Sequence, residues 1–156
     1  MVAQLSPAAR HGTGPLAGLM RDGALHCVFP PLADLREGSV SAHEALIRGP
    51  QGGPWHAPDA LLAQARSEGV LQDFELFCVF TALEQWSAQA TPGRLFVNIS
   101  ADALVHCVGM VGMAKLGEAV RRCGLNARML VLEITEHERV TNMPLLREAI
   151  DAVHAC

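Results

Sequence analysis

The sequence predicts an α/β fold in which parallel strands alternate with helices. From about residue 39 onward, short apolar segments alternate with longer segments of helical periodicity. That alternation is typical of parallel strands joined by crossover helices. The segments at 95–99 and 130–134 are apolar apart from single polar residues. Strands of that kind are buried on both faces, as in a barrel wall or a doubly wound sheet.

The first half of the chain contains two of the predicted strands. Residues 1–14 are small, polar and rich in Gly and Pro, so we expect a flexible leader. A short helix at 15–21 precedes a strand at 25–29, which Pro30-Pro31 should stop because proline donates no hydrogen bond to a sheet. The second strand is expected at 39–47. Three Gly and three Pro make 49–58 a loop.

The second half alternates helices with strands. Helices are predicted at 58–65, where proline suits the first turn, and at 71–88, where apolar residues recur at steps of three and four. A strand at 95–99 and a helix over 102–123 follow, the latter closed by Gly124. A fourth strand at 129–134 and a final helix at 144–155 complete the chain.

Composition and charge exclude several classes of protein. Half of the 156 residues are apolar and only 18% are charged, as in a globular protein rather than a disordered one. The formal net charge of −4 argues against a nucleic-acid duplex as partner. No apolar stretch approaches the roughly 20 residues that cross a bilayer, and the N-terminus lacks the apolar core of a signal peptide. Five cysteines without a C-x-x-C pair are typical of free thiols, so we expect a cytoplasmic protein.

Three polar side chains interrupt these apolar strands. Glu44, Asn98 and Glu133 each follow apolar residues near the end of a predicted strand. The carboxyl ends of parallel strands carry the active site in α/β folds. Carboxylate and amide oxygens converging there would hold a hard cation such as Mg²⁺ or Mn²⁺. Taken singly, each residue has a plainer interpretation, as a solvated strand end, a salt-bridge partner or a turn-former.

Arg48, four residues after Glu44, is either a salt-bridge residue or a clamp for a phosphate, and its position alone favours neither. Glu136, close to Glu133, could belong with it to an exposed acidic edge or to the first turn of the next helix. The seven histidines are scattered and show no ligand spacing. No residue of this chain is singled out as the catalytic acid or base.

The motifs around these residues resemble one family. Glu-Ala-Leu at 44–46, followed by Ile47-Arg48, resembles the signature that names the EAL domain. Phe-Val-Asn-Ile-Ser at 96–100 is similar to its VNxS strand, and Leu-Glu-Ile-Thr-Glu at 132–136 to its ExTE strand. Each motif is short, but the three occur in the order of the family and at compatible separations.

The resemblance implies a modified TIM barrel that hydrolyses cyclic di-GMP with Mg²⁺ or Mn²⁺, giving the linear dinucleotide pGpG. It implies that Glu44, Asn98 and Glu133 are metal ligands. Arg48 would contact a phosphate of the ligand, and Glu136 would support an active-site loop.

Two departures from the family bear on activity. Pro30 stands where the family has a glutamine that helps to hold the ligand, so one ligand contact is expected to be lost. The chain also ends before the DDFG strand and the later catalytic residues, so about four of eight strands are expected, an incomplete TIM-type barrel over 15–156. The alternatives are a segment of a phosphodiesterase, inactive by itself, and an inactive remnant that binds a nucleotide or a protein. A homo-oligomer or a complementary half of the barrel would cover the open sheet.

Overall fold

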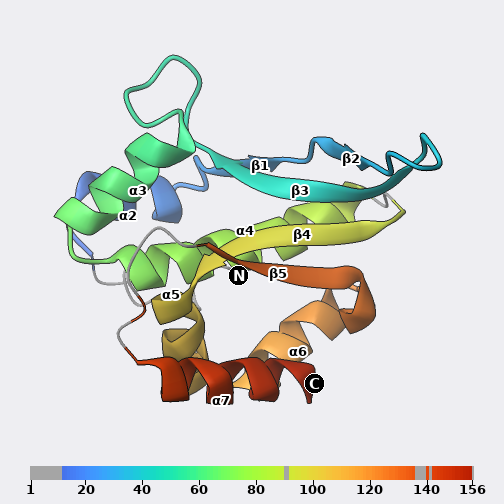
Figure 1. The fold of residues 1–156 in the computed structure, drawn as a ribbon. Helices are drawn as coiled ribbons and strands as arrows, with labels where there is room; N and C mark the ends of the chain where they lie inside the picture. Colours follow the sequence, from blue (N-terminus) through green and yellow to red (C-terminus); the bar gives the residue numbers. More distant parts are fainter. Residues whose placement is uncertain (1–11, 90–91, 136–139, 141, 156) are drawn as a thin grey trace.

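The computed structural model describes residues 12–89, 92–135, 140 and 142–155. Five strands form a sheet in which β1, β3, β4 and β5 are successive neighbours and β2 pairs with β3. Both β1 and β2 run antiparallel to β3, whereas β3, β4 and β5 are parallel (Figure 1). The strands are β1 (His26–Val28), β2 (Pro31–Ala33), β3 (Val40–Arg48), β4 (Arg94–Ser100) and β5 (Leu130–Thr135).

Helices alternate with the parallel strands, which confirms the α/β prediction. α4 is the central one and contacts β1, β3 and β4, while α5 contacts β4 and α7 packs on α5. The expected leader lies almost wholly outside the described residues. The helices are α2 (Pro15–Arg21), α3 (Pro58–Ser67), α4 (Leu71–Gln89), α5 (Ala101–His106), α6 (Met113–Arg122) and α7 (Met143–His154), with a π-helical turn at Cys107–Val111 and a 3₁₀ turn at Ala127–Met129.

The core lies between α4 and the sheet. Phe74 and Leu83 of α4 have no exposed surface, and Trp86 is 3% exposed. The Trp86 ring lies 5.2 Å from Phe29 and 5.0 Å from the imidazole of His43, centroid to centroid. The apolar stripe of this helix is therefore core packing, and Trp86 fixes the helix against the start of the sheet and against β3.

The prediction of one helix over residues 102–123 was wrong. α5 ends at His106 and continues as the π-helical turn, and Gly112 then adopts a positive φ of 79° before α6 begins. Glycine tolerates that conformation because it has no Cβ. The two helical segments are bent by 97°. Hydrophobic periodicity continues through this stretch and so gave no sign of the break.

A second difference is the short strand β2. Pro30-Pro31 was expected to end the sheet pairing, yet Pro31–Ala33 pairs with β3 next to β1. β2 lies on one side of β3 and pairs over three residues with a register shift between Leu32 and Ala33. Proline is tolerated at the first position of such a peripheral strand, where no ladder hydrogen bond is lost.

No single helix among the described residues is long and apolar enough to cross a membrane. The α5–α6 region passes that test of length and composition only as a pair of segments with the sharp bend between them.

Within the described part of the chain, β5 is the outer strand of the sheet and has a strand neighbour on one side only. Large apolar side chains are exposed at its two ends, in Met129 (37%) and Ile134 (39%), and in the first turn of α7, in Met143 (63%) and Leu145 (44%). An unpaired strand edge offers free N–H and C=O groups to another chain. An apolar surface beside such an edge adds a hydrophobic incentive to associate.

We therefore predict that the purified 156-residue chain self-associates. Light scattering should give a mass above that of one 16.7 kDa chain. Ile134→Lys places a charge at this edge and should shift the population toward monomer, whereas Leu35→Lys, at a 96% exposed position in the turn after β2, should not. A wild-type chain that stays monodisperse and monomeric, with slow amide exchange along β5, would refute the prediction.

Candidate metal and nucleotide site

The two faces of the parallel strands differ in burial. Along β4, Leu95, Val97 and Ile99 are buried against the helices, while the residues between them are only partly buried. Successive side chains of a strand point to opposite faces. Asn98 therefore points to the face of the sheet opposite the α4 side, which is the inner face if a sheet of this kind closes into a barrel.

Glu44, Asn98 and Glu133 share that second face. Asn98 of β4 is the register partner of Glu133 in β5. Glu44 is the partner of Phe96, two residues before Asn98 on the same side of β4. The Asn98 side-chain amide donates a hydrogen bond to Oε1 of Glu44 at 2.8 Å. The structure thus brings together three residues from segments far apart in the sequence.

The heights of the three residues differ slightly. Asn98 and Glu133 lie near the carboxyl ends of their strands, whereas β3 continues for four residues beyond Glu44, to Arg48. The hydrogen bond to Glu44 therefore runs diagonally. Glu44 and Asn98 are partly buried, and Glu133 is exposed.

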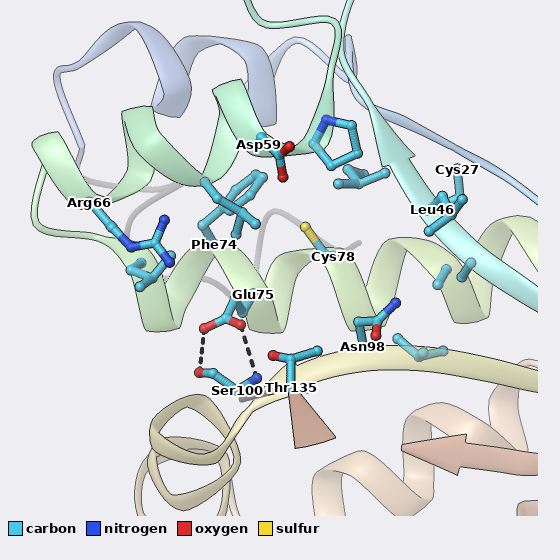
Figure 2. Close-up of a pocket in the computed structure, with 17 residues that line it drawn as sticks. Cys27, Leu46, Asp59, Arg66, Phe74, Glu75, Cys78, Asn98, Ser100 and Thr135 are labelled. Carbon is cyan, nitrogen blue, oxygen red and sulfur yellow. Dashed lines mark hydrogen bonds between the residues drawn. The ribbon is translucent and has the colours of Figure 1, made fainter. Parts of the chain in front are cut away.

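Glu44, Asn98 and Glu133 form a trio whose donor atoms suit a hard divalent cation. Two carboxylates and one amide carbonyl offer only oxygen, which Mg²⁺ and Mn²⁺ prefer. Because the Asn98 nitrogen is directed to Glu44, its carbonyl oxygen points the other way (Figure 2). In the part of the chain that the structure describes, no group of three His, Cys, Asp or Glu side chains forms an alternative metal site.

Arg48 is not brought into the trio. The Arg48 guanidinium turns back on β3 and donates to the carbonyl oxygen of Ile47 at 2.9 Å. Arg48 is on the same strand face as Glu44 because the two are four residues apart on one strand. Glu136 lies outside the described residues.

Pro30 lies directly beside the trio. Its carbonyl oxygen accepts the backbone N–H of Glu44 at 3.1 Å. The chain therefore offers a backbone contact to β3 at this position. A proline has no side-chain donor or acceptor, so Pro30 has nothing with which to contact a ligand through a polar side chain.

A cavity of about 330 Å³ is lined in part by Asn98. It lies between α3, α4 and the carboxyl ends of β3 and β4 (Figure 2). Its wall is mainly apolar, with polar groups from Asp59, Arg66, Glu75, Asn98 and Ser100. Cavities that bind small ligands have this mixture of apolar wall and few polar groups.

Sequence reasoning missed Glu75 of α4 as part of this region. Its Oε1 accepts the backbone N–H of Ser100 at 3.0 Å, and its Oε2 accepts the Ser100 hydroxyl at 2.6 Å (Figure 2). The signal was a charged residue inside the apolar stretch Phe-Glu-Leu-Phe at 74–77. A charge within a buried helical stripe requires a partner.

Two thiols also line the cavity. Burial raises the pKa of the Cys27 thiol to about 12, although the nearby Arg48 charge lowers it somewhat. Burial also raises the pKa of Cys78 well above its ordinary value. Both thiols are protonated at neutral pH and are therefore weak nucleophiles and weak metal ligands.

The motif segments 44–48, 96–100 and 132–135 thus lie on neighbouring strands of one sheet, and a comparison with protein families decides their identity. The model of the EAL domain matches residues 16–156. The chain belongs to the EAL domain family. A search of curated protein sequences finds no significant match.

Several solved structures have a similar fold. The EAL domain of Xanthomonas citri FimX, in complex with c-diGMP, is 17% identical, with a TM-score of 0.73 over 90% of this chain and 55% of that one. Klebsiella pneumoniae BlrP1, in a manganese and cyclic diGMP complex, is 22% identical, with a TM-score of 0.70 over 85% and 32%. The phosphodiesterase PaMucR, in a c-di-GMP complex, is 20% identical, with a TM-score of 0.68 over 85% and 56%.

The chain spans about half of the FimX and PaMucR chains and a third of BlrP1. Its sheet and helices therefore form an incomplete TIM-type barrel, as the sequence predicted. Identities of this size show the fold alone.

Proposed function

We propose that residues 15–156 form the N-terminal part of an EAL-type phosphodiesterase specific for cyclic di-GMP. Glu44, Asn98 and Glu133 bind Mg²⁺ or Mn²⁺ in this proposal, and Arg48 contacts a phosphate of the ligand. The observation that carries the proposal is the 2.8 Å hydrogen bond between Asn98 and Glu44, with Glu133 as the register partner of Asn98. It links the three motif residues on one face of the sheet.

The roles of these side chains follow from their chemistry. Bound divalent cations lower the pKa of a coordinated water and neutralise charge on a phosphodiester undergoing attack. Glu44 and Glu133 supply the negative charge that balances the cations, and the Asn98 carbonyl completes an oxygen ligand set. The Arg48 guanidinium is at the end of β3 and can swing from the Ile47 carbonyl to a phosphate, since arginine forms bidentate bonds to phosphates.

Two further roles rest on the sequence motifs and on the thiols. Glu136 is proposed to support an active-site loop, on its place in the third motif. A cytoplasmic location is proposed because Cys27, Cys78, Cys107 and Cys123 are free thiols, as is usual in a reducing compartment.

A second candidate function is a nucleotide-binding or protein-binding module without catalysis. Pro30 favours weakened ligand binding, and so argues against full activity, because this residue adjoins Glu44 through its backbone yet offers no side-chain contact to a ligand. As part of a complete domain, the phosphodiesterase segment would hydrolyse cyclic di-GMP and the binding module would not. Both candidates would bind a metal ion through this chain.

We predict binding without turnover for the 156-residue chain. A titration with Mn²⁺ should show binding that depends on Glu44, and hydrolysis of cyclic di-GMP should stay at the level of a protein-free control. A TIM barrel takes about 250 residues, so half of the site is missing. Calorimetry and chromatography of the products provide the measurements. Turnover by this chain that Glu44→Ala removes would contradict the argument that the second half is needed, and absence of Mn²⁺ binding would contradict the proposed metal site.

A further inference from the structure

Glu75 is a charged side chain in the core, only 9% exposed. Such a residue is costly to bury unless hydrogen bonds satisfy its charge. Both of its carboxylate oxygens accept hydrogen bonds from one residue, Ser100. These two hydrogen bonds fix both the backbone and the hydroxyl of Ser100, so the position of Ser100 matters.

Ser100 is held from both sides. It donates its hydroxyl proton to Glu75, and the same oxygen accepts the N–H of Ala103 at 3.1 Å as the N-cap of α5. At the other end of α5, His106 Nε2 lies 3.2 Å from Asp73 Oδ1. Two carboxylates in the first turns of α4 thus fasten both ends of the short helix that follows β4.

Ser100 is also the last residue of β4 and forms the last register pair with β5, opposite Thr135. Asn98 is two residues earlier on the same strand. An anchor on Ser100 therefore fixes the backbone that carries Asn98 and the edge on which Glu133 is paired. The cavity wall contains Glu75, Asn98 and Ser100 together.

We propose that Glu75 is a positioning residue of the metal site, which acts through Ser100 to hold the carboxyl end of β4 and so the Asn98 amide. This inference rests on the proposed function, since it assumes that Asn98 is a ligand. Ligand groups must stay within about 0.5 Å of the productive geometry. In this proposal Glu75 acts on Ser100 and not on the cation itself.

Four variants separate this role from general stability. Glu75→Gln keeps the shape but cannot accept both hydrogen bonds, and Ser100→Ala removes the hydroxyl. The double variant tests whether the two act as one unit, and Ser100→Thr restores a hydroxyl. The matched control is Thr81→Val, on the same helix, where a 4% exposed hydroxyl has no hydrogen-bond partner among the described residues.

The measurements are Mn²⁺ affinity by calorimetry and amide exchange of the β4 peptide without metal. Glu75→Gln and Ser100→Ala should each weaken Mn²⁺ binding about tenfold and speed exchange at Ser100. The double variant should be no weaker than either one, because residues of one network are not additive. Ser100→Thr and Thr81→Val should stay near wild type.

The outcomes distinguish the inference from the function on which it rests. If wild-type chain binds Mn²⁺ through Glu44 and Glu75→Gln binds like Thr81→Val, the positioning role is wrong and the proposed function stands. If the two single effects add fully in the double variant, Glu75 does not act through Ser100. If wild-type chain binds no Mn²⁺, the proposed function fails and the assignment to a metal site falls with it. In that case, unchanged amide exchange at Ser100 in the Glu75→Gln variant would also show that Glu75 does not hold Ser100.

Discussion

Replacing Glu44 by alanine is expected to weaken Mn²⁺ binding about 100-fold, or roughly 2.8 kcal/mol. Glu44 supplies one of two carboxylates in the trio, and its removal also deprives the Asn98 amide of its acceptor at 2.8 Å. This one substitution therefore removes the negative charge of Glu44 and also the hydrogen bond that orients Asn98, the second ligand. Isothermal calorimetry with Mn²⁺ measures the affinity, and in a complete EAL domain the same change should abolish hydrolysis.

Two further variants complete this experiment. Glu37→Ala removes an exposed carboxylate from the turn after β2 and should leave Mn²⁺ affinity unchanged. Glu44→Gln keeps an acceptor for Asn98 but no charge, and it should fall between wild type and Glu44→Ala. An affinity for Mn²⁺ that survives Glu44→Ala intact would place the cation elsewhere in the molecule.

Trp86→Ala is expected to lower the free energy of unfolding by about 3–5 kcal/mol. The indole is 3% exposed and contacts two rings, that of Phe29, just after β1, at 5.2 Å and that of His43, in β3, at 5.0 Å. Its loss leaves a cavity between α4, β1 and β3 that the surrounding backbone cannot fill. A domain of this size is stable by only about 5–15 kcal/mol, so much of that margin would be lost.

Guanidinium unfolding followed by circular dichroism measures this loss. Trp55→Ala is the matched control, since it truncates the other tryptophan, which lies half-buried in the loop after β3. Trp86→Phe keeps an aromatic ring and should cost less than Trp86→Ala. Equal losses for Trp55→Ala and Trp86→Ala would show that Trp86 does not hold the sheet on α4.

The strands and the polar trio could be read from the sequence because each depends on local pattern. Residues 95–99 and 130–134 are apolar runs with one polar residue, and a period of two then places Asn98 and Glu133 on a single face of neighbouring parallel strands. Helices α3, α4 and α7 were equally visible from their spacing and their prolines. The register between the strands could not be read from the sequence. The three motifs, in their order along the chain, required only that their strands be neighbours.

The partners of Glu75 and the break at Gly112 depend on tertiary contacts. Glu75 and Ser100 are 25 residues apart, and no local rule pairs a helical carboxylate with the end of a later strand. Residues 107–111 continue the apolar pattern of α5 through a π-helical turn. Periodicity therefore predicted one long helix, whereas the structure has two helices with Gly112 between them. Pro30 was expected to lack a side-chain contact, and its backbone bond to Glu44 appears only in three dimensions.

The Glu44–Asn98 hydrogen bond joins residues 54 positions apart. Closing a loop of that length costs conformational entropy before any contact compensates for it, and folding slows as such distant pairings multiply. The trio therefore has no precursor in a local hairpin or helix, and it comes into existence only when β3 and β4 have paired. A cation that binds the native chain alone would then act chiefly on the unfolding rate, lengthening the lifetime of the folded state while leaving the speed of folding almost untouched.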